Sequence, residues 1–171
     1  MVLGVHGQVD FQAGSSFRYL KGSDAAGLDQ GWMDPGFDDT GWSAGSAPFR
    51  YGDGVGGTEL SDMQYNYSTL YLRSTFTAAH ADSLEALQLS IDYDDGFVIW
   101  INGKMVLNQN APVTLSYNAF ATENHESGYA EVFELDPEEV ELVEGVNTLA
   151  VQGFNVSLES TDFLFDISLE A

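Results

Sequence analysis

Three carboxylates lie within four residues near the middle of the chain, at Asp92, Asp94 and Asp95. Calcium binds about six to eight oxygen ligands, which closely spaced aspartates and loop carbonyls can supply. The alternative is that Asp94 and Asp95 accept hydrogen bonds from the backbone amides of a turn, because a glycine follows them. This cluster therefore predicts either a calcium site, with Asp162 and Asn155 as further candidate ligands, or a turn stabilised by aspartates.

Aromatic and amide side chains in irregular, glycine-rich segments could bind a sugar. An aromatic ring can stack on the apolar face of a sugar, while amide and imidazole groups can hydrogen-bond to its hydroxyls. The candidate stacking residues are Trp32, Tyr51, Tyr65, Tyr67, Trp100 and Tyr117, and the candidate hydrogen-bonding residues are Asn118, Asn124, His125 and Asn155. The alternative for each residue is interior packing or a solvated loop, and packing is the favoured interpretation for Trp32, Trp42 and Trp100.

No catalytic motif stands out, so we do not expect this chain to be an enzyme. His6, His80 and His125 have no metal-binding spacing between them, and no Gly-x-Ser-x-Gly elbow occurs. The GDGVGG segment at 52–57 matches Gly-x-Gly-x-x-Gly, but it lacks the strand-to-helix setting that gives this motif its meaning. Paired carboxylates can hydrolyse glycosides, yet 27 acidic residues make chance pairs common.

Charge and composition exclude several classes of protein. The 27 acidic and 5 basic side chains give a formal net charge of -22, which repels phosphate backbones and argues against nucleic acid as a partner. A hydrophobic content of 44% argues against disorder. Without cysteine there is no disulfide or thiolate zinc site, and no apolar run is long enough for membrane insertion. The composition suits an extracellular domain, a salty habitat or oxygen-ligated cations.

The segment 84–108 contains three expected strands joined by tight turns at 94–96 and 102–103. Asn102-Gly103 is the strongest hairpin signal in the chain, because a type I′ turn needs positive φ at both central residues. The turn pairs Ile101 with Lys104, Trp100 with Met105, and Ile99 with Val106. The strand at 97–101 is apolar on both faces, which predicts a position inside a sheet with its second face covered by a loop, a second layer or a ligand.

The rest of the chain adds strands, loops and one short helix. Further strands are expected at 16–20, 71–77, 129–135, 146–154 and 161–169, with long loops at 22–69 and 108–128. Asp136 as N-cap and Pro137 at the first position start a helix near 137–143, which Gly145 stops. Arg73 is expected to pair with a carboxylate. These elements predict an all-β sandwich, mostly antiparallel, formed by residues 1–171 as a single domain.

Several motifs resemble the galactose-binding-like jelly roll in their type and order. They are FDDTGWSAGSAPFRYGDG (37–54), YLRSTF (71–76), DYDDGFVIWINGK (92–104) and EGVNTLAVQGFN (144–155). The segments at 110–112, 116–127 and 153–163 are similar to an accessory version of this domain in large secreted proteins of environmental bacteria, beside lamin-tail, CotH-like or carbohydrate-active modules. The resemblance implies a jelly-roll fold and a non-catalytic binding or accessory role.

The resemblance also implies places for calcium. Similar jelly rolls often hold calcium between N-terminal loop oxygens and a closing-strand acid, for which Asp24, Asp29, Asp34 and Asp166 are the candidates here. Residues 94–104 are also similar to the hairpin of protective-antigen-type domains, whose adhesin members use paired aspartates to hold a calcium that contacts sugar hydroxyls. Calcium is thus the one cofactor that the sequence implies, with Asp92, Asp94, Asp95, Asp162 and Asp166 as its candidate ligands.

Two functions of different classes follow from these observations. The first is a carbohydrate-binding module that holds a larger secreted or cell-surface bacterial protein on a polysaccharide or other glycan. The second is a structural or protein-interaction sandwich that spaces neighbouring domains, and a glycan hydrolase is a distant third. Exposed aromatic side chains near amide groups distinguish the first function from the second.

Overall fold

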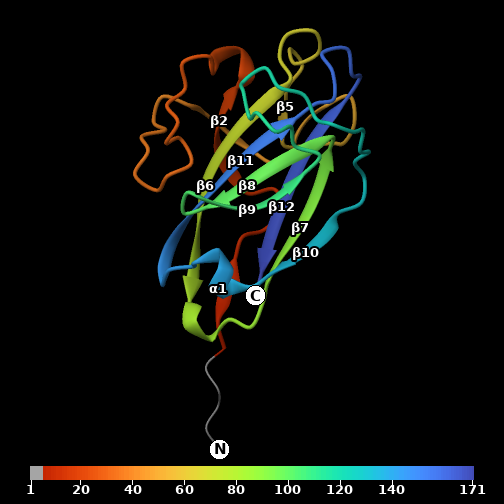
Figure 1. The fold of residues 1–171 in the computed structure, drawn as a ribbon. Coiled ribbons are helices and arrows are strands. Elements are labelled where there is room, and N and C mark those ends of the chain that lie inside the picture. Colours follow the sequence, from red (N-terminus) through yellow and green to blue (C-terminus); the bar gives the residue numbers. More distant parts are fainter. Residues whose placement is uncertain (1–5) are drawn as a thin grey trace, which may run out of the picture.

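Two β-sheets pack face to face in the computed structural model, which describes residues 6–171 (Figure 1). The larger sheet has seven strands in the order β3-β2-β6-β11-β8-β9, and β1 pairs with β6 off this path. Its strands are β1 (Gln8–Asp10), β2 (Ser16–Lys21), β3 (Ser43–Ser46), β6 (Thr69–Ala79), β8 (Gly96–Ile101), β9 (Lys104–Gln109) and β11 (Gly145–Phe154).

The smaller sheet has five strands in the order β10-β7-β12-β4-β5. Its strands are β4 (Phe49–Tyr51), β5 (Thr58–Glu59), β7 (Leu87–Asp94), β10 (Glu131–Leu135) and β12 (Phe163–Glu170). Neighbouring strands are antiparallel in both sheets except for the parallel pair β4 and β5. Short helices connect the strands: the 3-10 turns η1 (Gly22–Asp24) and η2 (Ala81–Ser83) and the α-helix α1 (Pro137–Val140). The predicted all-β, mostly antiparallel sandwich with one short α-helix is confirmed.

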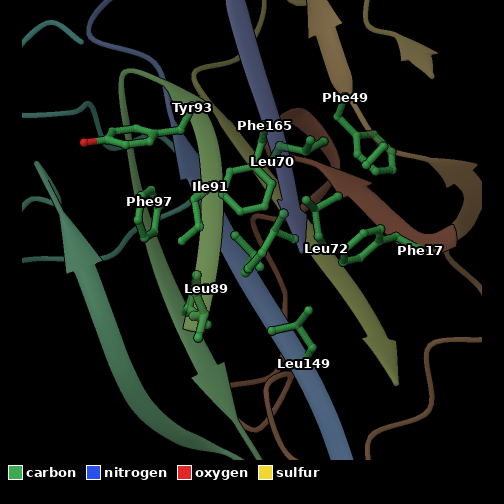
Figure 2. Close-up of a cluster of buried hydrophobic side chains, with 14 of the residues drawn as sticks. Phe17, Phe49, Leu70, Leu72, Leu89, Ile91, Tyr93, Phe97, Leu149 and Phe165 are labelled. Atoms are coloured by element: carbon green, nitrogen blue, oxygen red, sulfur yellow. The ribbon is translucent and has the colours of Figure 1, made fainter. Parts of the chain in front are cut away.

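The main core lies between the sheets because strands from both direct alternate apolar residues inward. Figure 2 shows side chains of the two sheets meeting there. The labelled residues are Phe17, Phe49, Leu70, Leu72, Leu89, Ile91, Tyr93, Phe97, Leu149 and Phe165, all buried. Burial of each large apolar side chain contributes roughly 1.5–3 kcal/mol to folding.

A second apolar cluster covers the outer face of the larger sheet. Trp32 and Trp42, from the segment between η1 and β3, pack with Tyr71, Val98 and Trp100 of the sheet. The ring centroid of Trp32 lies 5.2 Å from that of Trp100 and 5.0 Å from that of Tyr71. This cluster explains why the strand at 97–101 is apolar on both faces. Of the three covers that the sequence allowed (a loop, a second layer or a ligand), the structure has a loop.

The β8–β9 hairpin has the predicted turn but not the whole predicted register. Asn102 and Gly103 have φ values of 51° and 83°, as a type I′ turn requires. Ile101 pairs with Lys104 and Trp100 with Met105, as predicted. Ile99, however, lies opposite Leu107, so its predicted pairing with Val106 is wrong. An irregularity between Ile99 and Trp100 shifts the register.

The turn at 94–96 connects the two sheets, since β7 belongs to the smaller sheet and β8 to the larger one. Tyr93 and Phe97 meet across the core with ring centroids 4.8 Å apart. The sequence predicted the strands on either side of this turn but did not distinguish a hairpin from a crossing between sheets.

Other boundaries differ from the prediction. Strands β3, β4 and β5 lie where a loop was expected, and β1 was not predicted. The helix ends at Val140 rather than near 143 because Glu141 takes a left-handed conformation, with φ of 59°. The N-cap was predicted correctly, since the Asp136 carboxylate accepts a hydrogen bond from the Glu138 amide at 2.9 Å. Within residues 6–171, no helix is long and apolar enough to cross a membrane.

Arg73 ties the loop layer to the larger sheet. Its guanidinium is buried, and Nε donates to Asp39 Oδ2 at 2.9 Å, which confirms the predicted pairing with a carboxylate. Nη1 donates to the backbone carbonyl of Trp32, and the guanidinium carbon lies 5.2 Å from the centroid of the Phe37 ring. Arg73 therefore fixes the segment that carries the tryptophan cluster.

Replacing Asp39 by Ala leaves the buried Arg73 charge without its carboxylate. We expect the free energy of unfolding to fall by about 3 kcal/mol in urea denaturation, because an uncompensated buried charge is costly. Lys104→Ala is the control, since the exposed pair of Lys104 with Glu141 is worth less than about 1 kcal/mol. Equal losses in the two variants would contradict this role of Arg73.

Candidate functional site

The aspartates of 92–95 lie at the end of the sandwich opposite α1, where β7 ends and β8 begins (Figure 1). The peptide bond between Asp94 and Asp95 is cis. Two connections approach this end: the segment 110–130 between β9 and β10, and the turn 155–162 between β11 and β12. We call these the long loop and the closing turn.

Asp95 connects both segments to the sheets. Its Oδ1 accepts a hydrogen bond from the amide of His125 at 2.9 Å, and its Oδ2 accepts one from the amide of Val156 at 2.8 Å. The Asp95 carbonyl accepts from Asn110 Nδ2 at 3.0 Å, and its amide donates to the carbonyl of Phe154. Asp95 therefore accepts hydrogen bonds from backbone amides, as the second interpretation of the sequence predicted. These amides belong to distant segments and not to the turn that contains Asp95.

Asp94 has a different environment although it is adjacent. Its side chain is 2% exposed, and Oδ1 has no hydrogen-bond partner. Burial, followed by the charges of Asp95, Asp162 and Glu126, raises the pKa of Asp94 to about 8. A buried carboxylate oxygen without a donor is costly, so this site suits a proton or a cation.

Three other acidic side chains gather near one another at this end of the sandwich. One carboxylate oxygen from each of Asp53, Glu126 and Asp162 lies within 4.8 Å of the other two. Burial, and then the charges of Asp53 and Glu126, raise the pKa of Asp162. Sequence reasoning named Asp162 but missed Asp53 and Glu126. The available signal was weak, because single acids in glycine-rich loops are common in this chain.

The other predicted calcium ligands lie outside this group. Asp92 Oδ1 accepts from the amide of Gly128 at 2.8 Å, and Asp166 Oδ1 accepts from the amides of Gly14 and Ile167. Burial raises the pKa of Asp166. Of the N-terminal candidates, Asp24 and Asp34 lie outside the group too, and Asp29 accepts from the amide of Gly31. The structure thus brings Asp162, but not these aspartates, into the only such acidic group found within residues 6–171.

Half of the predicted carbohydrate-binding residues are buried. Trp32 and Trp100 belong to the tryptophan cluster, at 5% exposure each. The Tyr51 hydroxyl donates to the Ser160 carbonyl and accepts from Asn155 Nδ2, while the Tyr67 hydroxyl donates to Asp62 Oδ1. These five residues follow the packing alternative in this structure, and each is at most 6% exposed.

His125 and Asn124 occupy intermediate and exposed positions on the long loop. The His125 ring stacks on Tyr93 with centroids 3.8 Å apart, and its Nε2 lies 2.7 Å from Glu131 Oε1. His125 therefore anchors the loop on the smaller sheet. Asn124 is exposed next to it.

Two of the three remaining candidates line a surface groove formed in part by the long loop. Tyr117 and Asn118 line a cavity of about 220 Å³, with Phe120 beside them. The other lining residues are Gly22, Ser23, Asn66, Tyr67, Ser68 and Leu158. Tyr117 and Phe120 are 39% and 42% exposed, and Tyr65, which is 67% exposed, donates its amide hydrogen to the Leu158 carbonyl at the rim. Sequence reasoning missed Phe120, Leu158 and Asn66. We call this cavity the aromatic groove.

Backbone anchors hold the aromatic groove in shape. Ser68 Oγ donates to the Ala119 carbonyl at 2.6 Å, and Thr69 Oγ1 donates to the carbonyl of Tyr117. Gly22 permits this approach, because a Cβ there would lie 2.3 Å from Thr69 Oγ1. The backbone that carries the exposed rings is therefore anchored at the start of β6 before any ligand arrives, which lowers the entropy lost on binding.

Comparison with known proteins relates the chain to glycoside hydrolases through its fold. No family model and no curated protein matches the chain. Bacteroides uniformis β-glucuronidase matches with a TM-score of 0.61 at 19% identity, over 97% of this chain and 18% of the enzyme. A glycosyl hydrolase family 2 member from Bacteroides cellulosilyticus DSM 14838 matches with a TM-score of 0.58 at 19% identity, over 97% of this chain and 20% of that one.

Ruminococcus gnavus β-glucuronidase also has a similar fold over part of its length. It matches with a TM-score of 0.56 at 12% identity, over 99% of this chain and 30% of the enzyme. One related structure is described as a calcium binding mutant of Bacteroides uniformis β-glucuronidase 2, with a TM-score of 0.53 at 19% identity. Identities this low show the fold alone. The chain therefore has the fold of a β-sandwich domain of glycoside hydrolases and spans less than a third of the length of these enzymes.

Replacing Asp95 by Ala removes the acceptor for the amides of His125 and Val156. Hydrogen bonds to a charged group contribute about 1.5–3 kcal/mol each, so we expect a loss of at least about 3 kcal/mol in the free energy of unfolding. Hydrogen exchange should quicken at these two amides. Asp92→Ala is the matched control, because it removes one such bond, and unchanged exchange in Asp95→Ala would contradict the anchoring role.

The raised pKa of Asp94 predicts a pH dependence of stability in metal-free buffer. Its folded pKa of about 8 exceeds the usual value, so the native state binds the extra proton and loses stability as pH rises from about 4 to about 8. We expect Asp94→Asn to reduce this loss by more than about 1 kcal/mol in urea denaturation at several pH values with EDTA. Parallel curves for Asp94→Asn and the unmodified chain would contradict the assignment.

Proposed function

We propose that this chain is a non-catalytic carbohydrate-binding domain that holds a larger secreted or cell-surface bacterial protein on a polysaccharide, with calcium stabilising its loops. The aromatic groove is the observation that carries this proposal. It combines two exposed rings with amide and hydroxyl groups, which is the composition that a sugar-binding surface needs.

The rings and polar groups of the groove have complementary tasks. Tyr117 and Phe120 offer apolar faces for the C–H groups of a sugar ring. Asn118 and Ser23 supply groups that donate and accept hydrogen bonds, as sugar hydroxyls do. The volume of the cavity, about 220 Å³, is smaller than the roughly 300–1,000 Å³ of a typical small-molecule site. This size suits one or two sugar units of a chain that continues along the surface.

The fold and the family resemblance support an accessory role. The related structures are glycoside hydrolases, of which a domain this size forms only a part. The galactose-binding-like motifs of the sequence imply a binding module instead of a catalytic one. The acidic surface, with its net charge of -22, favours neutral or cationic glycans over polyanions.

A protein-interaction role is the second candidate, and one surface favours it. Strand β10 lies at an edge of the smaller sheet, and Val132 on this strand is 64% exposed. Tyr129, just before it, is 89% exposed. An open strand edge with exposed apolar side chains can pair with a strand of another protein.

Retention on polysaccharide tests the proposed function. We expect the chain to be retarded in affinity electrophoresis by at least one polysaccharide of a broad panel, and Tyr117→Ala or Phe120→Ala to weaken binding about tenfold, since loss of an aromatic contact costs about 1.4 kcal/mol. Tyr129→Ala is the control, because it removes an exposed ring that lies outside the groove.

Two outcomes count against glycan binding by the aromatic groove. One is the absence of retention across the panel both with calcium and with EDTA. The other is an equal loss in Tyr129→Ala and Tyr117→Ala, which would place the contact elsewhere. Binding of a protein partner that Val132→Lys abolishes would favour the second candidate function.

A further inference from the structure

We propose that Asp53, Glu126 and Asp162 form a calcium site that joins three loops at one end of the sandwich, close to the buried Asp94, which pairs with Leu164 two residues after Asp162. This inference deepens the calcium part of the proposed function and does not depend on which glycan binds. The site differs from the calcium ligands that the sequence suggested, because two of its three carboxylates, Asp53 and Glu126, belong to segments that showed no metal pattern.

The spacing of the three outer carboxylates fits one ion. Calcium lies about 2.3–2.6 Å from its oxygen ligands, so two ligands of the same ion are at most about 4.6–5.2 Å apart. One oxygen from each of Asp53, Glu126 and Asp162 lies within 4.8 Å of the other two. A single cation can therefore contact all three without a change of the backbone.

The three carboxylates come from segments that are far apart in the sequence. Asp53 follows β4, Glu126 lies on the long loop, and Asp162 ends the closing turn. Gly52, with φ of 80°, brings Asp53 to this place: a Cβ at Gly52 would lie 2.2 Å from the Thr161 carbonyl oxygen. The loop after β4 can thus contact the closing turn only because residue 52 is a glycine.

The buried carboxylate of Asp94 is a second observation that points to a bound cation at this end of the sandwich. Its side chain is 2% exposed, and its Oδ1 has no hydrogen-bond donor within the described chain. In the antiparallel pairing of β7 with β12, Asp94 lies opposite Leu164, two residues after Asp162. Within residues 6–171, no ion pair involves Asp94 or the three acids of the group. Their negative charges therefore repel one another at the loop end. A divalent cation would replace this repulsion by attraction.

The ligand chemistry favours calcium over other divalent cations. All three side chains of the group are carboxylates, which are hard oxygen ligands, and the group contains no histidine or thiolate that would select zinc. Ligands from three separate loops give an irregular arrangement, which calcium tolerates and the strict octahedral geometry of magnesium does not. The exposed positions of Asp53 and Glu126 leave room for water to complete the coordination.

The ion would act on the segment that also carries the aromatic groove. Glu126 and the rings of Tyr117 and Phe120 all belong to the long loop. Calcium would fix one end of this loop, while Ser68 and Thr69 fix the other. We therefore assign the ion a structural task that keeps the groove in a single conformation.

Calcium titration of the full chain tests this site. After treatment with EDTA, isothermal titration calorimetry should show one calcium ion per chain. Calcium at a hundredfold excess over its Kd should raise the melting temperature by about 5–10 °C, since a ligand that binds only the native state stabilises it. Magnesium at the same concentration should give a smaller rise.

Matched variants locate the ion. Asp53→Asn, Glu126→Gln and Asp162→Asn should each weaken calcium binding at least tenfold and remove most of the thermal shift. Glu85→Gln is the control, because Glu85 is an exposed acid just before the start of β7, whereas Asp94 is the last residue of that strand. Hydrogen exchange of the long loop should slow when calcium is added to the unmodified chain, but not when it is added to Glu126→Gln.

The results separate this inference from the proposed function. No calcium-induced shift, or equal shifts in the unmodified chain and in all three variants, would overturn the site even if the chain binds a polysaccharide. A calcium shift that the three variants lose supports the site even if no polysaccharide of the panel is retained. A shift lost only in Asp29→Asn or Asp34→Asn would place the ion in the N-terminal loop and overturn the proposal.

Discussion

The two hydrogen bonds of the Asp95 carboxylate are the constraint on which the loop end of this protein depends. The carboxylate is buried where the chain crosses from one sheet to the other, and its two oxygens accept amides from His125 and Val156. A buried charge of this kind is tolerated only while its acceptors are used. The same contact that neutralises the cost of burying Asp95 therefore holds the long loop and the closing turn at a fixed distance from the sheets.

Opposite charges are arranged differently on the two sides of the sandwich. On the outer face of the larger sheet, the buried Arg73 has a carboxylate from Asp39 and a carbonyl from Trp32, so the loop layer is complete within the chain. At the loop end, Asp94 and the neighbouring acids have no such basic partner among the described residues. A chain with five basic side chains cannot neutralise every acidic group internally. The loop end is consequently where we expect a bound cation to change stability most.

Local chemistry explains what the sequence predicted. The Asn102-Gly103 turn and the Asp136 cap depend on residues that are adjacent in the chain, and both are present as expected. Strands β3, β4 and β5 were missed because they have two to four residues each in a glycine-rich segment, and tertiary pairing makes them strands. The register shift at Ile99 and the sheet crossing after Asp94 likewise depend on packing between distant strands. The acidic group was only partly predicted, since Asp53, Glu126 and Asp162 meet only after three loops fold together.

The motif of adjacent aspartates shows why sequence patterns left two interpretations open. Asp95 behaves as an amide acceptor, and Asp94 keeps a buried oxygen without a donor, so neighbours of the same type divide the two roles between them. The division follows from the crossing between sheets. The crossing directs the Asp95 side chain to the amides of the long loop and the closing turn, and leaves Asp94 at the end of β7, opposite Leu164. Because Asp95 holds the long loop and the closing turn, it also restricts the positions of Glu126 and Asp162, which these two segments carry. A cation at the loop end would then meet ligands on two segments that Asp95 already holds near the sheets, which lowers the ordering that its binding requires.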